Sequence, residues 1–352
     1  MYFASAAVLA TALSQTAAAD LKKFDNPHPE TEIENKEPAH PDTLKGLFPG
    51  HKHDRFQEGR IKQDGKSNEA SIDQEYSDEG LAQITQKGRL NSADTTQVDF
   101  GNGGYFDHPS NIAVIDQAGS YNYASSYQLQ IGHDVNTVQI HQESDKFAYY
   151  DNYAYAEQVG QGNQSVISQK SKDKSGSGNN YGETYQYGED NVAIVDQMGH
   201  ANDGVSVQEG YGNSSTIVQR GDGYAGVNTA YVNQYGVENI ADVEQSGPGN
   251  SIYGSGNYAA VNQDGYWNKA VIDQEGDLNS ATVNQYNYEN LAKVEQFGYD
   301  NYATVDQTSS LNVALVSQDG KSNSADIDQA YGYDNLAVIV QHGVGNSAGV
   351  YQ

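Results

Sequence analysis

Constant and variable residues alternate along the C-terminal part of the chain. Between residues 257 and 352 the unit N-x-A-x-[VI]-x-Q recurs nine times, so positions 1, 3, 5 and 7 are constant while positions 2, 4 and 6 vary. A period of two is typical of a β-strand with one constrained face. We therefore predict that each unit is a strand whose Asn, Ala, Val or Ile, and Gln side chains point inward.

Four residues separate most consecutive units, and one of them is commonly glycine. Glycine supplies the positive φ of a tight reversal, so each period of eleven should be a seven-residue strand and a four-residue turn. The turn glycines are expected at Gly265, Gly276, Gly298 and Gly320. The amides expected on the inward face are Asn257, Gln263, Asn268, Gln274, Asn279, Gln285, Asn290, Gln296, Asn301, Gln307, Asn312, Gln318, Asn323, Gln329, Asn335, Gln341, Asn346 and Gln352.

An eleven-residue period also occurs in right-handed helical supercoils. Strict alternation, recurrent β-branched residues and frequent glycine disfavour a long helix, so we reject that alternative. Two units instead form a coil of about 22 residues, and coils stack identical residues at the cross-β spacing of about 4.8 Å. Each inward amide should donate to the coil above and accept from the coil below, which satisfies a group that is otherwise costly to bury. The predicted fold class is an all-β, amyloid-like β-solenoid of stacked two-strand coils.

The chain divides into three predicted parts. Residues 1–19 resemble a secretion signal peptide, with a short apolar run and Ala17-Ala18-Ala19 before Asp20. Residues 20–56 hold five of the seven prolines and are expected to be a flexible leader. Residues 57–352 hold 22 units of the form N-x5-Q and three degenerate copies, which corresponds to roughly a dozen coils of a repeat solenoid.

Insertions between units are expected to form surface loops. They are residues 101–109, 129–135, 143–151, 170–179, 220–227 and 246–249, and the last precedes a damaged unit at 250–256 that lacks its Gln. The histidines of the leader could hold a metal loosely, but no metal-ligand spacing is present, so solvated side chains are favoured. They are His28, His40, His51 and His53.

Composition narrows the possible functions. The absence of cysteine excludes disulfides and thiolate metal sites, and the net charge of −28 argues against nucleic acid or an anionic membrane as partner. Outward acidic residues such as Asp273 and Glu295 should stack and repel, so acid pH or divalent cations would speed assembly. Alternatively, these charges only prevent side-by-side aggregation. The 27 tyrosines lie mostly at turns or outward positions, where ordinary surface packing competes with an adhesive or bundling role.

At these residues the sequence resembles the curlin repeat family, the subunits of curli fibres. The family repeat runs S-x5-Q-x-G-x-[GN]-N-x-A-x3-Q, and residues 268–285 are similar to it. The resemblance covers about residues 57–352. It implies a secreted functional amyloid of the bacterial biofilm matrix, with roles in adhesion and aggregation, exported through an outer-membrane pore and nucleated at the cell surface by a minor subunit. The regular last units resemble a major subunit.

Three classes of function compete. A self-assembling fibre subunit needs open β-edges at both ends of the solenoid, and we expect such an edge at Tyr351-Gln352. A monomeric adhesin or ice- or ligand-binding solenoid would need a regular outward face, whereas positions 2, 4 and 6 are irregular. An enzyme would need a site motif, and none is present. We therefore expect an extracellular homopolymer with no catalytic activity, cofactor, nucleic-acid partner or membrane insertion.

Overall fold

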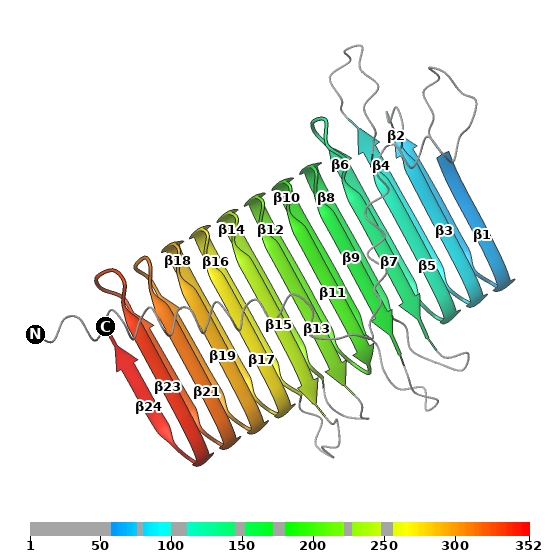
Figure 1. Cartoon of the computed structure of the whole chain (residues 1–352). Coiled ribbons are helices and arrows are strands. Elements are labelled where there is room, and N and C mark those ends of the chain that lie inside the picture. The colour runs from blue at the N-terminus through cyan, green and yellow to red at the C-terminus, as the bar shows by residue number, and fades with distance from the viewer. Residues whose placement is uncertain are drawn as a thin grey trace, which may run out of the picture. The chain divides into compact units, whose positions relative to one another are not determined.

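The computed structural model describes residues 58–75, 80–99, 111–144, 152–171, 180–221, 227–247 and 256–352. The predicted signal segment, the leader and its four histidines lie outside these ranges. The described residues form an all-β solenoid, which confirms the predicted fold class (Figure 1). No helix among them is long and apolar enough to cross a membrane.

The described strands form two parallel sheets of twelve strands each. The odd sheet contains β1 (Glu58–Lys66), β3 (Leu81–Arg89), β5 (Ile112–Ser120), β7 (Thr137–Glu143), β9 (Gln164–Lys170), β11 (Val192–Gly199), β13 (Ser214–Gly221), β15 (Ile240–Gly247), β17 (Lys269–Asp277), β19 (Leu291–Tyr299), β21 (Val313–Lys321) and β23 (Leu336–Val344). The even sheet contains β2 (Glu69–Glu75), β4 (Ser92–Asp99), β6 (Tyr123–Gln130), β8 (Tyr153–Gln161), β10 (Tyr181–Glu189), β12 (Asp203–Tyr211), β14 (Thr229–Val237), β16 (Tyr258–Tyr266), β18 (Ser280–Tyr288), β20 (Tyr302–Gln307), β22 (Ser324–Gln329) and β24 (Ser347–Tyr351).

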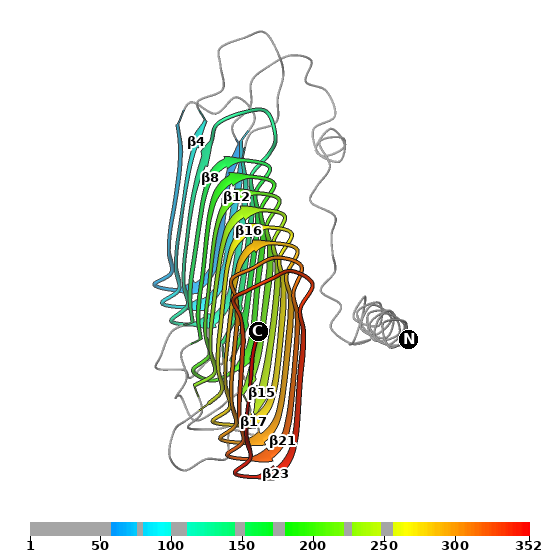
Figure 2. The ribbon, with the colours of Figure 1, turned by 90° about the vertical axis from the view of Figure 1, so that its left-hand side faces the viewer.

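Each strand pairs with the second strand along the chain, so one coil takes one strand from each sheet (Figure 2). The pairing is parallel and keeps equivalent positions of the repeat opposite each other: Ala270 pairs with Ala292 and Gln274 pairs with Gln296. Equivalent positions of the repeat therefore lie above one another along the described stack, and at position 7 the paired residues are both Gln, as the repeat predicts.

The strands are longer, and the reversals shorter, than the sequence predicts. A full strand covers positions 2 to 10 of the repeat, as in β16 and β19, so the predicted four-residue turn is wrong. Asn lies just before every strand except β1 and β3, and the predicted turn glycines lie inside the strands. The reversal itself is made by the residue immediately before Asn, which has a left-handed backbone, for example Leu278 with φ of 61° and Asp300 with φ of 58°.

The insertions interrupt neither sheet. The predicted loop at 129–135 begins later than expected, because Leu129 and Gln130 still belong to β6. Most residues of the other predicted insertions lie outside the described ranges, as does the damaged unit at 250–256 except for Gly256. On either side of that unit β15 pairs with β17 and β14 pairs with β16, so the register continues.

The core lies between the two sheets and is made of Ala at position 3 and Val or Ile at position 5. Large residues of one sheet face small residues of the other: a Cβ added at Gly182, a position-3 residue, would lie 3.0 Å from Cγ2 of Ile167. Where both facing positions are polar, the hydroxyls bond each other, as Ser206 and Ser215 do at 2.5 Å and Ser165 and Thr184 do at 2.6 Å. These two pairs bond across the sheets, while the buried hydroxyls of Thr95 and Ser126 bond each other within the even sheet at 2.6 Å; in both cases pairing avoids their desolvation cost.

Candidate functional site: the buried amide ladders

Two continuous rows of glutamine run through the interior, one along each sheet. The glutamines at position 7 between Gln86 and Gln329 are buried, with exposed fractions of 0–2 %. Each donates from Nε2 to Oε1 of the next Gln in the same sheet; Gln274 to Gln296 and Gln285 to Gln307 both measure 2.8 Å. All of these bonds point from the N-terminal toward the C-terminal coil, so each row has a direction.

Each glutamine also bonds the opposite sheet. Nε2 of Gln274 donates to the carbonyl oxygen of Tyr258 at 2.9 Å, and Nε2 of Gln296 donates to that of Ser280 at 3.0 Å. The acceptor is the position-2 carbonyl of the strand before, sixteen residues back in the chain. Both protons of the amide are therefore used, one along the stack and one across the core. The repeat did not predict this second bond.

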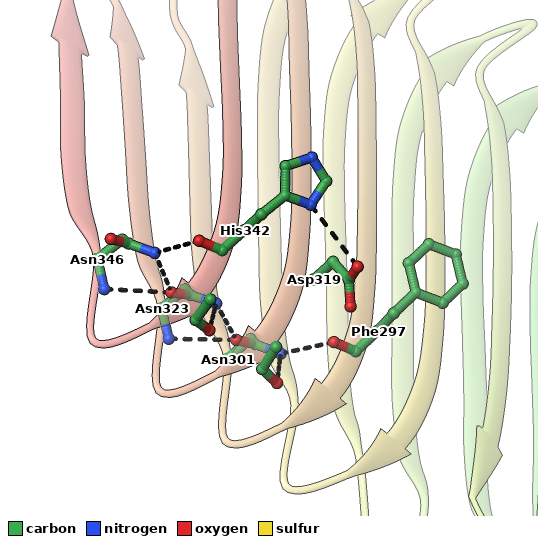
Figure 3. A network of polar contacts seen from close by, with 8 residues as sticks. Phe297, Asn301, Asp319, Asn323, His342 and Asn346 are labelled. Carbon is green, nitrogen blue, oxygen red and sulfur yellow. Dashed lines mark hydrogen bonds and ion pairs between the residues drawn. The ribbon is translucent and has the colours of Figure 1, made fainter.

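The asparagines form rows of a different kind at the corners of the coil. Oδ1 of Asn279 accepts the backbone N–H of Asn301 at 3.2 Å, and Oδ1 of Asn301 accepts that of Asn323 at 3.1 Å. These bonds point from the C-terminal toward the N-terminal coil, opposite to the glutamine rows. Figure 3 shows the row from Asn301 through Asn323 to Asn346. The prediction that every amide donates to the coil above is therefore wrong for asparagine.

The side-chain nitrogen of each asparagine closes the reversal. Nδ2 of Asn301 donates to the carbonyl oxygens of Phe297 at 3.1 Å and Gly320 at 3.3 Å, and also to Oδ1 of Asn279 at 3.0 Å. The Asn carboxamide thus satisfies backbone groups that the two-residue reversal leaves without a strand partner. This explains why Asn, and not merely a polar residue, opens almost every unit.

The glycines at position 9 form a row in which consecutive backbones approach closely. Gly276 has φ of 111° and Gly298 has φ of 114°, a region that L-residues rarely adopt. A Cβ at Gly298 would lie 2.1 Å from the carbonyl oxygen of Gly320. The positive φ expected of Gly265, Gly276, Gly298 and Gly320 is present, but its role is this close approach within the strands.

The last coil differs from the interior of the stack. Asn335 is half-buried, and Asn346 and Gln352 are exposed, although each still bonds the preceding member of its row as predicted. Gln341 is buried, with 6 % exposed, while its neighbours Val338 and Val340 are 46 % and 58 % exposed. At the other end, Gln63 is exposed and only its Nε2 has a row partner, Gln86. The row amides at the two ends of the stack are thus more exposed than those of the interior, with Gln341 as the exception.

Acidic side chains stack on the outer face of the odd sheet, as the sequence predicts. Asp273 pairs in register with Glu244 on one side and with Glu295 on the other. Burial, followed by repulsion from Glu244, Glu295 and Glu275, raises the pKa of Asp273 to about 6, while Lys293 opposes the shift. Lys293 forms a 2.7 Å ion pair with Glu295.

We expect the solenoid to become more stable when pH falls from neutral. The folded pKa of Asp273 lies above its unfolded value, so the folded state binds the proton more tightly, and stability rises as pH falls through about 6 toward 4. Because the side chain is half-exposed, we expect a gain of about 1–2 kcal/mol. Urea unfolding near neutral pH and about two units lower measures it, with Asp273→Asn as the control. The variant should be more stable than wild type near neutral pH and should show a smaller gain on acidification; an unchanged gain would contradict the assignment to Asp273.

Metal binding has no support in the described part of the chain, where no three His, Cys, Asp or Glu side chains are grouped to hold an ion. The regular feature that the solenoid repeats is instead the set of amide rows, in which side chains bond the equivalent residue of the next coil. The fold and these rows define a β-solenoid repeat protein whose site is structural. Comparison with known families agrees: the curlin associated repeat matches residues 254–286 and 298–330.

Residues 254–286 and 298–330 therefore carry the curlin associated repeat, which agrees with the resemblance seen in the sequence. The two matched segments include β16, β17, β20, β21 and β22. The other described strands continue the same register beyond them. No curated protein matches the chain.

Proposed function

We propose that this protein is a secreted structural subunit that stacks end to end into curli-like amyloid fibres. The observation that carries the proposal is that each amide row has a direction and that the first and last described amides of the row have no amide partner on their outer side. Among the described residues, no strand pairs with the outer edges of β1, β2, β23 or β24. An unpaired edge of this kind is a template for another strand of the same register.

A second copy in the same orientation would complete both kinds of row. Nε2 of Gln341 would donate to Oε1 of Gln63 of the next molecule, which continues the direction of the interior Gln bonds. Oδ1 of Asn346 would accept from Asn68, which continues the opposite direction of the Asn bonds. A copy in the reverse orientation would place donor against donor. The proposed fibre is therefore polar, with a single subunit orientation.

The biological setting follows from the family and is part of the same proposal. The fibres would lie outside the cell, attached to its surface, and would contribute to adhesion and aggregation within a biofilm matrix. A nucleating subunit and an outer-membrane secretion pore are the further partners. The net charge of −28 would keep the unassembled chain soluble during export.

The experiment that tests the proposal follows the full-length secreted protein from monomer to aggregate. We expect growth that preformed fibres accelerate, an amyloid-dye signal, and fibre diffraction with a meridional reflection near 4.7 Å. Short labelled seeds viewed by microscopy should extend with unequal rates at their two ends. A protein that stays monomeric at high concentration and ignores seeds would overturn the proposal and favour a monomeric adhesin.

A further inference from the structure

The outer face of the even sheet carries a row of tyrosines that the odd sheet lacks. In the described strands, every tyrosine at an outward position between Asn and Gln belongs to the even sheet. Three of them occupy position 2 on consecutive strands: Tyr123 on β6, Tyr153 on β8 and Tyr181 on β10, with Tyr153 paired in register to both others.

The three rings stack face to face along the solenoid. The ring centroids of Tyr123 and Tyr153 are 5.1 Å apart with planes inclined by 11°, and those of Tyr153 and Tyr181 are 4.8 Å apart with planes inclined by 7°. Parallel pairing of the strands holds the rings at this spacing, because each Cα is bonded into the same ladder. Equivalent ring carbons of neighbouring tyrosines therefore face each other across little more than a van der Waals contact.

Carboxylates accept hydrogen bonds from the phenols around this row. Glu183 accepts from the hydroxyls of both Tyr181 and Tyr185, the second at 2.9 Å, and Glu157 accepts from Tyr155 at 2.8 Å and from Tyr187 at 2.9 Å. A phenol hydrogen-bonded to a carboxylate can pass its proton to that base as it loses an electron. Burial, followed by the bond to Glu183, raises the pKa of Tyr181, so the phenol keeps its proton until oxidation.

Apart from tyrosine, few oxidisable side chains are present. The chain has no cysteine, two methionines and one tryptophan against 27 tyrosines, and Trp267 lies on the turn after β16, three strands along the even sheet from β10. Tyr181 is 37 % exposed and Tyr123 and Tyr153 are half-buried, so a small oxidant or an electron-accepting radical can reach the row.

We propose that Tyr153 and Tyr181 form an oxidative cross-linking site, in which a peroxidase and hydrogen peroxide join the two rings into dityrosine within one molecule. Each phenol loses one electron and one proton, and the proton of Tyr181 passes to Glu183. The two phenoxyl radicals form one C–C bond between carbons ortho to the oxygens, and the two ring hydrogens move through solvent to the phenol oxygens. One peroxide is reduced to two waters, which balances the two electrons.

The bond would join consecutive coils of the even sheet and close a loop of the chain between residues 153 and 181. Such a loop restricts the unfolded chain in the same way as a disulfide, which this cysteine-free protein cannot make. The cross-link would therefore strengthen a single solenoid against unfolding. It is independent of fibre formation, because both rings belong to the same molecule.

The test treats dilute full-length monomer with a haem peroxidase and limiting hydrogen peroxide. We expect dityrosine fluorescence, no covalent dimer on a denaturing gel, and a mass-mapped peptide pair that joins residues 153 and 181. Tyr153→Phe keeps the ring and the stack but removes the central phenol, and should lower the dityrosine yield at least about fivefold. Tyr302→Phe is the matched control, because Tyr302 also occupies position 2 but lies between Ser280 and Ser324; its yield should equal that of wild type.

A second variant tests the proton transfer. Glu183→Gln keeps a hydrogen-bond acceptor beside Tyr181 but removes the base, so the rate of dityrosine formation should fall several-fold near neutral pH and recover as added buffer base is increased. Equal yields in wild type and Tyr153→Phe, or a bond that maps to exposed tyrosines such as Tyr286 and Tyr288, would overturn the proposal. If Glu183→Gln formed dityrosine at the wild-type rate at all buffer concentrations, Glu183 would not be the base that accepts the proton.

Discussion

Replacing Gln274 and Gln296 together with alanine is expected to destabilise the solenoid by about 3–6 kcal/mol and to slow fibre growth strongly. Both side chains are fully buried, and each makes one bond along its row and one across the core. Their removal leaves buried amide and carbonyl groups unpaired, at about 1–3 kcal/mol each, and opens a cavity. Urea unfolding of the monomer and dye-monitored growth kinetics measure the two effects.

A matched control lies on the opposite face of the solenoid. Asn262 donates to Asn284 at 2.8 Å in a row of amides that points outward, so Asn262→Ala with Asn284→Ala removes consecutive stacked amides without exposing a buried polar group. We expect a loss of about 1 kcal/mol or less, since water replaces the lost bonds. Equal effects of the two double variants would show that burial between the sheets is not what makes the Gln rows important.

Replacing Gly298 with alanine is expected to cost about 3 kcal/mol or more and to lower the yield of folded protein. The backbone at Gly298 has φ of 114°, and the new Cβ would lie 2.1 Å from the carbonyl oxygen of Gly320, which belongs to the next strand of the same sheet. That oxygen cannot move without breaking the pairing of β19 with β21. Urea unfolding together with circular dichroism would show the loss.

Gly345→Ala measures the cost of the left-handed backbone conformation without the steric collision expected at Gly298. Gly345 has φ of 69°, but a Cβ there would meet nothing within 4 Å, so only the left-handed conformation is penalised, by about 1 kcal/mol. A cost at Gly298 no larger than that at Gly345 would contradict the close approach of the coils. Asn287 provides a comparison within the protein, because it is a residue with a Cβ at the glycine position of β18. The strand stacked on it, β20, ends early at Gln307.

Much of the architecture could be predicted from particular residues. The alternation in units such as 268–274 assigns Ala270, Ile272 and Gln274 to the inner face, because side chains of a strand alternate between its two faces. The spacing of eleven, repeated with one residue type at each inward position, predicts stacked coils because a buried amide is satisfied only by an identical neighbour. The register pairs Gln274 with Gln296 as this reasoning requires.

Other features of the site could not be read from the repeat. The left-handed residue before Asn is Leu278 in one unit and Asp300 in another, so side-chain type conceals a shared backbone conformation. A signal was present in Gly162, Gly212 and Gly345, which occupy the same position. The position of Gly298 within a strand, and not in the reversal, also escaped prediction, because glycine marks positive φ without specifying what lies beside it.

The sequence by itself determined the fold class, the inward and outward faces of the units, and the pairing of like with like along the stack, since all three depend on periodicity within one chain segment. Only the tertiary structure decided the bond from each Gln to the opposite sheet, the opposite directions of the Gln and Asn rows, and the stacking of Tyr123, Tyr153 and Tyr181 beside Glu183. The physical reason is that these contacts depend on the stagger between the two sheets and on insertions that bring distant residues into register. Neither of these can be read from the alternation of residues within a single strand.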